Sequence, residues 1–177
     1  MNKLDLGCGP WKKTGFYGID CHKDWSHLNS NLKVNADLYH DLNTGIPFAD
    51  NSIEEIYCSH FLEHVIDPIK LLFEIKRVCK NKSKVEIKVP MFEMCISNLK
   101  NINNITFDKI NFFPLNINEN ITIRQSSEEH ITAFFPDWFE KNMPKGFIIK
   151  RKEYLPKIIN ENNDLIFELQ VDLEVIK

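Results

Sequence analysis

A glycine-rich turn that follows a short apolar segment constrains the fold of this chain more than any other feature. Residues 2–6 (NKLDL) have the character of a short buried strand, and Gly7-Cys8-Gly9-Pro10 follows as a turn. Glycine lets the backbone turn tightly and approach a ligand closely, and open α/β sheets bind ligands at the carboxyl ends of their strands. The start of the chain therefore predicts a strand and a ligand-binding turn in an α/β fold.

A second predicted strand, residues 16–20 (FYGID), ends in an acidic residue. At such a strand end, the Asp20 carboxylate can accept hydrogen bonds from both hydroxyl groups of a ribose. The G-C-G pattern by itself would indicate only a tight turn. Because the turn, the acidic strand end and a later parallel crossover agree, the combination favours a nucleoside pocket.

The rest of the chain alternates between further predicted strands and helices. Apolar residues recur at helical spacing between residues 60 and 80, which makes this segment the clearest predicted helix. A strand on each side of it implies a parallel crossover, and the last two predicted strands follow each other in hairpin order. The additional elements are strands at residues 32–38, 52–59, 85–89, 147–154 and 165–176, and a short helix at residues 136–143.

The length of 177 residues is that of one domain, so we predict a single domain over residues 1–177. Residues 91–129 lack clean periodicity and are too many for a featureless loop in a compact domain. We interpret residues 91–129 as a cover over the site that also shapes the substrate region, with short strands at residues 105–107 and 121–124.

Charge and cysteine usage narrow the class of protein. The net charge is −3 and the basic residues are interspersed with acidic ones, so no footprint for nucleic acid is visible. No apolar run reaches the roughly 18 residues of a membrane span, and no signal-peptide pattern precedes the first strand. The five cysteines are scattered without a C-x-x-C pair, which fits a reducing compartment. We therefore expect a cytoplasmic protein without membrane or nucleic-acid partners.

Six short motifs occur in order along the first half of the chain. They are residues 4–9 (LDLGCG), 18–20 (GID), 41–42 (DL), 46–52 (IPFADNS), 59–64 (SHFLEH) and 74–78 (EIKRV). Together they resemble the class I S-adenosylmethionine-dependent methyltransferases, and most closely the branch with an L-E-H motif, often found among small-molecule and glycan methyltransferases. The resemblance covers roughly the first ninety residues. It implies a doubly wound, mostly parallel Rossmann-like sheet with a C-terminal antiparallel hairpin, and S-adenosylmethionine as cofactor.

The resemblance also implies cofactor-binding roles for particular residues. Gly7, Cys8 and Gly9 would line the methionine and ribose portion of the cofactor. Asp5 would steady this loop and the methionine amino group, and Asp20 would hold the ribose.

Two further residues would contact the adenine. Asp41 would face its amino group, with Leu42 beside the ring. A simple turn residue before residues 43–45 is the competing interpretation of Asp41. Asp37 takes the adenine role if the register of this segment differs.

The predicted fourth strand ends at Ser59 and His60, which places both at the mouth of the pocket near the transferred methyl group. His60 is the best candidate for a general base, because an imidazole titrates near neutral pH. On a helix, His60, Glu63 and His64 would share a face and approach a divalent metal. The competing interpretation makes Ser59 a helix cap and gives Glu63 and His64 ordinary hydrogen bonds. We favour it for the metal question and predict no metal site, and we keep Ser59 among the predicted cofactor-binding residues.

His130 is a second candidate for the acceptor side. It precedes an apolar pair and a predicted short helix, an order that looks like the later part of the same methyltransferase branch. A histidine satisfied by hydrogen bonds within a loop is the competing interpretation.

The chain departs from the family pattern in its front half. Only ten residues separate Gly9 from Asp20, fewer than the dozen or more that a helical crossover needs, so we predict a shortened first crossover helix. We also expect no N-terminal helix of the kind that commonly covers the cofactor. An uncovered sheet edge would permit a homodimer.

These observations predict a methyltransferase that transfers a methyl group from S-adenosylmethionine to an oxygen or nitrogen of a small molecule or glycan. The shortened front half also suits a catalytically silent binding module with the same fold. A nicotinamide-dependent Rossmann enzyme is a third reading, but the chain lacks the G-x-G-x-x-G spacing.

Overall fold

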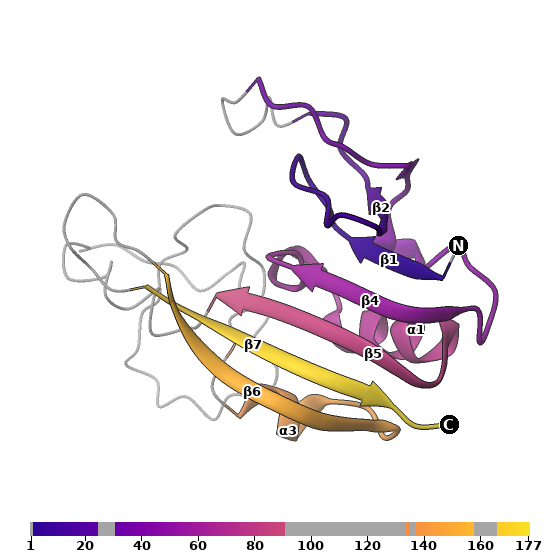
Figure 1. The fold of residues 1–177 in the computed structure, drawn as a ribbon, viewed down its shortest axis with the longest axis vertical. Coiled ribbons are helices and arrows are strands. Elements are labelled where there is room, and N and C mark those ends of the chain that lie inside the picture. The colour runs from indigo at the N-terminus through magenta and orange to yellow at the C-terminus, as the bar shows by residue number, and fades with distance from the viewer. Residues whose placement is uncertain (1, 25–30, 91–133, 135–136, 158–165) are drawn as a thin grey trace.

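A computed structural model describes residues 2–24, 31–90, 134, 137–157 and 166–177. In this part of the chain, seven strands form one mixed sheet in the order β3-β2-β1-β4-β5-β7-β6 (Figure 1). The strands are β1 (Lys3–Leu6), β2 (Tyr17–Asp20), β3 (Leu38–Tyr39), β4 (Ile53–Ser59), β5 (Cys79–Pro90), β6 (Phe147–Lys157) and β7 (Ile166–Val175). The order of these strands is that of the predicted class I methyltransferase fold.

One part of the sheet is parallel, and the other part is an antiparallel hairpin. Strands β1 to β5 pair in parallel, whereas β7 pairs antiparallel with both β5 and β6. The chain moves outward from β1 to β3 and then returns to the other side of β1 with β4. The carboxyl ends of β1, β2, β4 and β5 therefore meet at one edge on both sides of this switch point, where open α/β sheets bind ligands.

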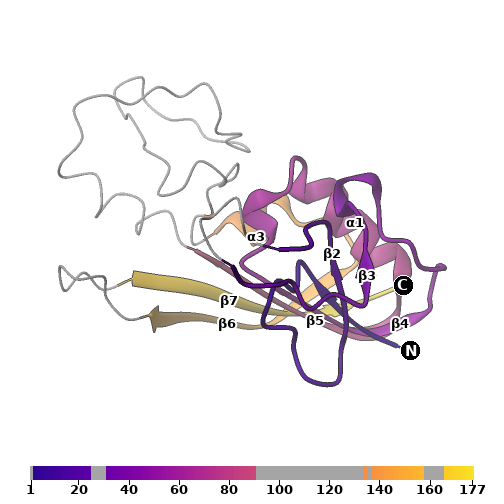
Figure 2. The ribbon, with the colours of Figure 1, turned by 90° about the horizontal axis from the view of Figure 1, so that it is seen from above.

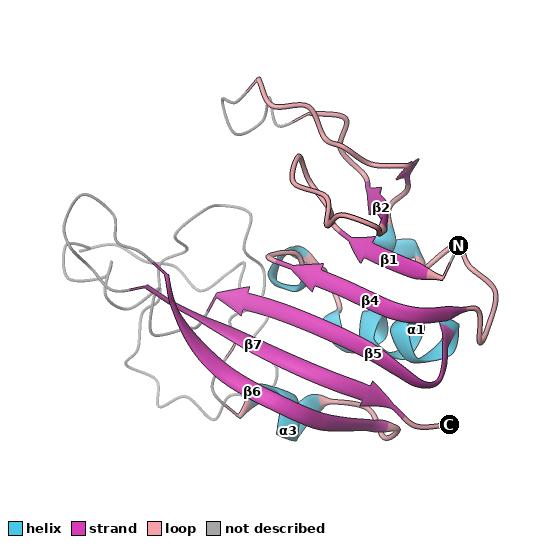
Figure 3. Ribbon diagram, viewed as in Figure 1, coloured by secondary structure: helices cyan, strands magenta, loops and turns pink. Residues whose placement is uncertain are grey.

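The connection from β1 to β2 contains no helix (Figure 3), so the first crossover is even shorter than the predicted vestigial helix. The predicted strand at residues 32–38 is wrong, because only Leu38 and Tyr39 pair with β2. The Asn35 and Asp37 backbone N–H groups instead donate to Gly9 O and Gly18 O, both at 2.9 Å. These backbone hydrogen bonds to the first turn and to β2 take the place of the regular hydrogen-bond ladder of a strand.

The predicted helix at residues 60–80 is divided into a 3₁₀ turn η3 (Leu62–His64) and the helix α1 (Pro68–Val78). Proline lacks a backbone N–H and is tolerated only in the first helical turn. The Asp67 side chain accepts a hydrogen bond from Lys70 N at 2.9 Å and caps the new start. The helix therefore begins at Pro68.

The described α-helices, α1 and α3 (Trp138–Asn142), lie on one face of the sheet (Figure 2). The core between α1 and the sheet includes the fully buried side chains of Leu4, Ile56, Leu72 and Ile75. Burying one such side chain contributes about 1.5–3 kcal/mol. This apolar layer holds the strand ends in place.

The opposite face of the sheet is polar. Along β5, Lys84, Glu86 and Lys88 alternate with buried valine and isoleucine residues. Lys13 Nζ lies 2.7 Å from Glu86 Oε2 and 4.0 Å from the centre of the Tyr57 ring. Within the described ranges, charged pairs thus occupy the face that no described helix covers.

Arg77 on α1 fastens the loop that leads into β4. Its guanidinium donates to Ile46 O at 2.8 Å and Phe48 O at 2.9 Å, and it pairs with Glu74 at 2.7 Å. Glu74 Oε2 in turn accepts from Ile46 N at 2.9 Å. These bonds join the motif at residues 46–52 to the motif at residues 74–78. None of the described helices has the length and apolarity needed to cross a lipid bilayer.

Candidate functional site

The turn after β1 is held by left-handed glycines and by backbone hydrogen bonds to β2. Gly7 has φ +66° and Gly9 has φ +52°, a region that other residues rarely adopt. Gly7 N donates to Ile19 O at 2.9 Å. A Cβ atom on Gly7 would lie 2.2 Å from the Phe61 ring. Glycine at position 7 is therefore required both by its φ angle and by the close approach of Phe61.

The Asp20 carboxylate is oriented by the backbone around it. Its Oδ2 accepts from Gly9 N and its Oδ1 from His22 N, both at 2.9 Å. The carboxylate is 9% exposed at the end of β2. A carboxylate has about four acceptor positions, so two hydrogen bonds leave capacity for a ligand hydroxyl.

Asp5 and Cys8 lie just below the turn. Asp5 is 2% exposed, and its Oδ2 accepts from Lys13 N at 2.7 Å, which ties down the loop that returns to β2. Burial raises the pKa of Asp5 to about 6, although Lys13 partly opposes the effect. Burial, followed by the charges of Asp5 and Asp20, raises the pKa of Cys8 to about 12. Cys8 is therefore a neutral packing residue rather than a nucleophile.

Asp41 and Asp37, the two candidates for the adenine contact, make different hydrogen bonds. Asp41 caps the 3₁₀ turn η2 (Leu42–Thr44), where its Oδ1 accepts from Asn43 N at 2.9 Å. Burial raises the pKa of Cys21, and the charges of Asp20 and then Asp41 raise it further.

Asp37 binds Lys12 Nζ at 2.8 Å and Gly18 N at 2.7 Å. The Lys12 hydrogen bond, with that from Gly18, lowers the pKa of Asp37. The Asp37 carboxylate thus fastens the first turn to β2. Asp41 follows His40, whose backbone N–H donates to Asp20 O at 2.9 Å.

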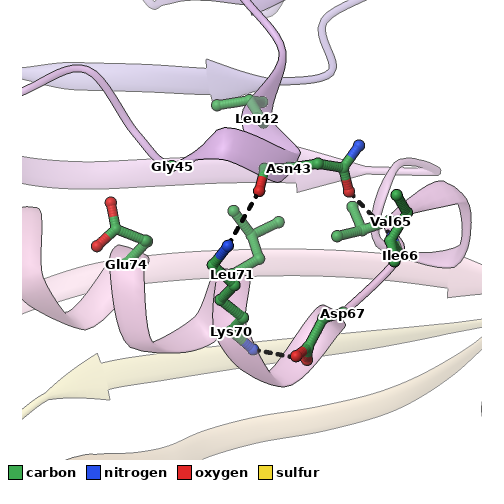
Figure 4. A pocket seen from close by; sticks show the side chains of 9 residues that line it. All are labelled: Leu42, Asn43, Gly45, Val65, Ile66, Asp67, Lys70, Leu71 and Glu74. Carbon is green, nitrogen blue, oxygen red and sulfur yellow. Dashed lines mark hydrogen bonds between the residues drawn. The ribbon is translucent and has the colours of Figure 1, made fainter.

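A cavity of about 230 Å³ lies between η2 and the start of α1 (Figure 4). Asn43 Oδ1 accepts from Ile66 N at 3.0 Å, and Lys70 Nζ donates to Asn43 O at 3.3 Å across it. Leu42 lines this cavity, but Gly7, Asp20 and His60 do not. The cavity is thus adjacent to the cofactor-side residues and separate from the first turn.

His60 follows β4 in a left-handed conformation with φ +51°. Its backbone N–H donates to Lys88 O at 2.9 Å, and its Nε2 lies 2.5 Å from Glu168 Oε2. Its Nδ1 is 3.5 Å from Glu63 Oε1. A left-handed residue other than glycine is uncommon, and such strain occurs often at functional sites.

Ser59 ends β4 and pairs in register with Lys88. The structural reading of Ser59 as a helix cap is wrong, because Phe61 precedes η3 without a side-chain cap and Asp67 caps α1. The place of Ser59 is instead at the strand end beside His60.

Glu63 is fully buried, and neither of its carboxylate oxygens has a hydrogen-bond partner among the described residues. The nearest basic atoms are His60 Nδ1 at 3.5 Å and His64 Nε2 at 4.0 Å. In the described part of the chain, no group of three or more His, Cys, Asp or Glu side chains is arranged to hold a metal ion.

Glu168 is a site residue that sequence reasoning missed. It lies on β7 opposite Pro90 and is 3% exposed. Its sequence neighbours give no sign of burial, because Gln170 and Asp172 continue the same polar alternation. His130, residues 105–107 and 121–124, and residues 91–129 as a cover lie outside the described residues.

Comparison with known proteins shows which domain family the chain resembles. Residues 4–87 match the family model described as "Methyltransferase domain". This match and the fold of the solved structures below support a class I methyltransferase domain with S-adenosylmethionine as cofactor. An uncharacterized protein of Methanocaldococcus jannaschii is 33% identical over 97 residues, which are 49% of this chain and 39% of that protein. The matched segment is thus well under half of that relative.

Solved structures of other proteins share the fold over nearly all of the chain. A SAM-dependent methyltransferase of Methanosarcina mazei has a TM-score of 0.60 at 16% identity and covers 99% of this chain and 92% of its own. The chain bound to the Trm112 methyltransferase activator of Haloferax volcanii has a TM-score of 0.62 at 12% identity, covering 99% and 82%. The [4+2]-cyclase SpnF has a TM-score of 0.59 at 10% identity, covering 99% and 75%. At these identities the likeness is one of fold, and the cyclase shows that the fold accommodates other chemistry.

Proposed function

We propose that this methyltransferase domain binds S-adenosylmethionine at the carboxyl ends of β1, β2 and β4 and transfers its methyl group to an oxygen or nitrogen of a small molecule or glycan. The observation that carries the proposal is the Asp20 carboxylate, which Gly9 N and His22 N orient at the end of β2. Two oriented oxygens beside a glycine turn are what a ribose with two hydroxyl groups requires.

The residues at this edge fit the cofactor. Gly7 and Gly9 leave backbone without side chains where the methionine and ribose portion would lie, and a larger residue at position 7 would collide with Phe61. Asp20 would hold the ribose hydroxyls. Asp41 follows His40, whose backbone N–H donates to Asp20 O, and would face the adenine.

Three further residues complete the proposed cofactor side. Asp5 holds the loop through Lys13 N, and the neutral Cys8 packs beneath it. Leu42 is 4% exposed and would lie beside the adenine ring. Ser59 would line the cofactor at the end of β4.

When bound, S-adenosylmethionine supplies an electrophilic methyl group on a sulfonium. The chain's own residues orient the acceptor and exclude water, since positioning is the main source of rate in such a displacement. His60 at the end of β4 is the proposed general base and would take the acceptor proton at a ring nitrogen. His130 remains a second proposed acceptor-side residue.

Titration calorimetry with S-adenosylhomocysteine tests the cofactor part. The Asp20→Asn substitution removes the charge of the carboxylate. Hydrogen bonds to a charged acceptor contribute about 1.5–3 kcal/mol, so we expect at least about tenfold weaker binding of S-adenosylhomocysteine. Asp172→Asn on β7 is the matched control and should bind like the wild type. A folded wild-type protein that binds no S-adenosylhomocysteine at millimolar concentration would contradict the proposal.

A catalytically silent module is the second candidate, because the first crossover contains no helix. That reading is favoured if the protein binds S-adenosylhomocysteine yet turns over no acceptor in a panel of alcohols, phenols, amines and sugars.

We further propose that the enzyme is cytoplasmic. Its proposed protein partner is either a second copy bound at the sheet edge or an activator like the Trm112 of the H. volcanii complex. Light scattering of the purified protein distinguishes a homodimer from a monomer.

A further inference from the structure

We infer that Glu168 is the positioning residue of His60, and that this carboxylate–imidazole pair directs the enzyme toward acceptors that are neutral or cationic and carry an O–H or N–H group. The inference rests on the proposed function. It adds a residue from the C-terminal hairpin to a site whose other members come from the first half of the chain.

The contact joins two distant strands. Glu168 Oε2 lies 2.5 Å from His60 Nε2, across a separation of 108 residues. Glu168 is 4% exposed in its side chain, whereas the His60 side chain is 36% exposed. A buried carboxylate that accepts from Nε2–H fixes both the ring orientation and the tautomer of the histidine. The buried partner is therefore the anchor, and the half-exposed imidazole is the group that a substrate can reach.

The backbone of His60 is fixed as firmly as its ring. The left-handed φ of +51° sets the direction in which the side chain leaves β4, and the N–H bond to Lys88 O holds it there. Such a conformation is maintained only when the surroundings impose it. An imidazole held by its backbone and by Glu168 has little freedom to turn away.

Two carboxylates face the imidazole of His60: Glu63 comes from η3 and Glu168 from β7. His64 Nε2 lies 4.0 Å from Glu63 Oε1, and Lys88 of β5 contributes its backbone carbonyl to the His60 N–H. Glu63 Oε1 lies 3.5 Å from His60 Nδ1, and the whole Glu63 side chain is buried. Two carboxylates on either side of one imidazole stabilise its protonated form and disfavour an anionic acceptor.

The pair lies next to the glycine turn. Phe61 follows His60 directly, and its ring fills the space where a Cβ of Gly7 would stand. The residue that links His60 to the cofactor turn is thus its immediate neighbour. His60 and Glu168 accordingly border the side of the turn that leads toward β5 and β7.

The acceptor oxygen or nitrogen forms a bond to the methyl carbon while the methyl–sulfur bond breaks, and its electron pair stays on sulfur as S-adenosylhomocysteine. The acceptor proton goes to the imidazole of His60. The positive charge of the sulfonium is thereby replaced by that of the imidazolium between Glu63 and Glu168.

The pairing itself can be tested without an acceptor. In an NMR titration of the histidine ring signals, Glu168→Gln removes one of the flanking charges and should move the His60 midpoint to lower pH by about one unit. Glu168→Asp keeps the charge and should restore most of the wild-type midpoint. Glu174→Gln, on the same strand but at its other end, should leave it unchanged. An unchanged midpoint in Glu168→Gln would overturn the pairing.

A second measurement compares the binding of sinefungin with that of S-adenosylhomocysteine. Sinefungin carries a C–NH3⁺ group where the cofactor has its sulfonium methyl. With carboxylates nearby, the wild type should bind sinefungin at least about fivefold more tightly than S-adenosylhomocysteine, as about 1 kcal/mol of attraction implies. Glu168→Gln should lower this ratio toward one without weakening S-adenosylhomocysteine, and Glu174→Gln should preserve it.

The outcomes separate the two proposals. If the wild type binds neither ligand, the proposed function fails and the NMR titration alone decides the pairing. If the wild type binds both ligands equally, or Glu168→Gln keeps the preference, the role of Glu168 is overturned while cofactor binding stands. If Glu168→Gln does not fold, the wild-type ratio and the Glu168→Asp titration still decide the inference.

Discussion

The cofactor side and the acceptor side of the proposed site are built in different ways. On the cofactor side, the bond from Gly9 N to Asp20 Oδ2 spans 11 residues. On the acceptor side, the contact between His60 and Glu168 spans 108. Contacts between near neighbours leave a local sequence pattern, whereas contacts between distant strands depend on the sheet order. The difference explains why the first side is recognisable from motifs and the second is not.

The largest effect on stability is expected at Gly7, where the turn on the cofactor side packs most closely. Gly7→Ala forces a Cβ into the Phe61 ring at a left-handed φ, so we expect a loss of about 3 kcal/mol in the free energy of unfolding by chemical denaturation. Gly15 has φ +83° with nothing within 4 Å of its Cβ position, so Gly15→Ala should lose only about 1 kcal/mol. Equal losses would show that packing against Phe61 does not define the turn.

The next largest effect is the pH dependence of stability that Asp5, on the cofactor side, produces. The folded protein holds the Asp5 proton up to a pKa of about 6, against 3.8 for the ordinary group. The folded state therefore binds more protons between these values, and the contribution of Asp5 to stability is greatest below pH 4. It falls by about 2–3 kcal/mol as the pH rises through 6. Asp5→Asn keeps an acceptor for Lys13 N and should lack this fall. Parallel stability profiles from pH 4 to 7 for both proteins would contradict the assignment.

A smaller effect is expected on the acceptor side. A double-mutant cycle of His60→Gln and Glu168→Gln should give a coupling energy of about 1–2 kcal/mol, since a partly buried charge-assisted bond joins them. The comparison pair is Lys3 and Glu55, 2.6 Å apart with side chains 45% and 30% exposed. Water screens this pair, so its coupling should not exceed about 0.5 kcal/mol. Similar couplings for both pairs would remove the contrast between an anchored histidine and a surface contact.

The sequence predicted the elements whose hydrogen bonds and packing are local. β1 and β2 lie within one residue of their predicted bounds, because a short apolar run that ends in a glycine turn or an acidic residue has few alternatives. The helix was misjudged at its start, since Pro68 and the Asp67 cap outweigh the apolar spacing of residues 60–67. The strand predicted at residues 32–38 failed because its backbone groups bond to Gly9 and Gly18 instead.

The sequence by itself determined the residues of the proposed cofactor side, because a left-handed turn needs glycine and a ribose needs an acceptor at a strand end. Only the tertiary structure decided the acceptor side. The antiparallel pairing of β5 with β7 brings Glu168 to His60, and burial makes that carboxylate an anchor. Pairing and burial are properties of the whole sheet, and the residues beside Glu168 carry no trace of either.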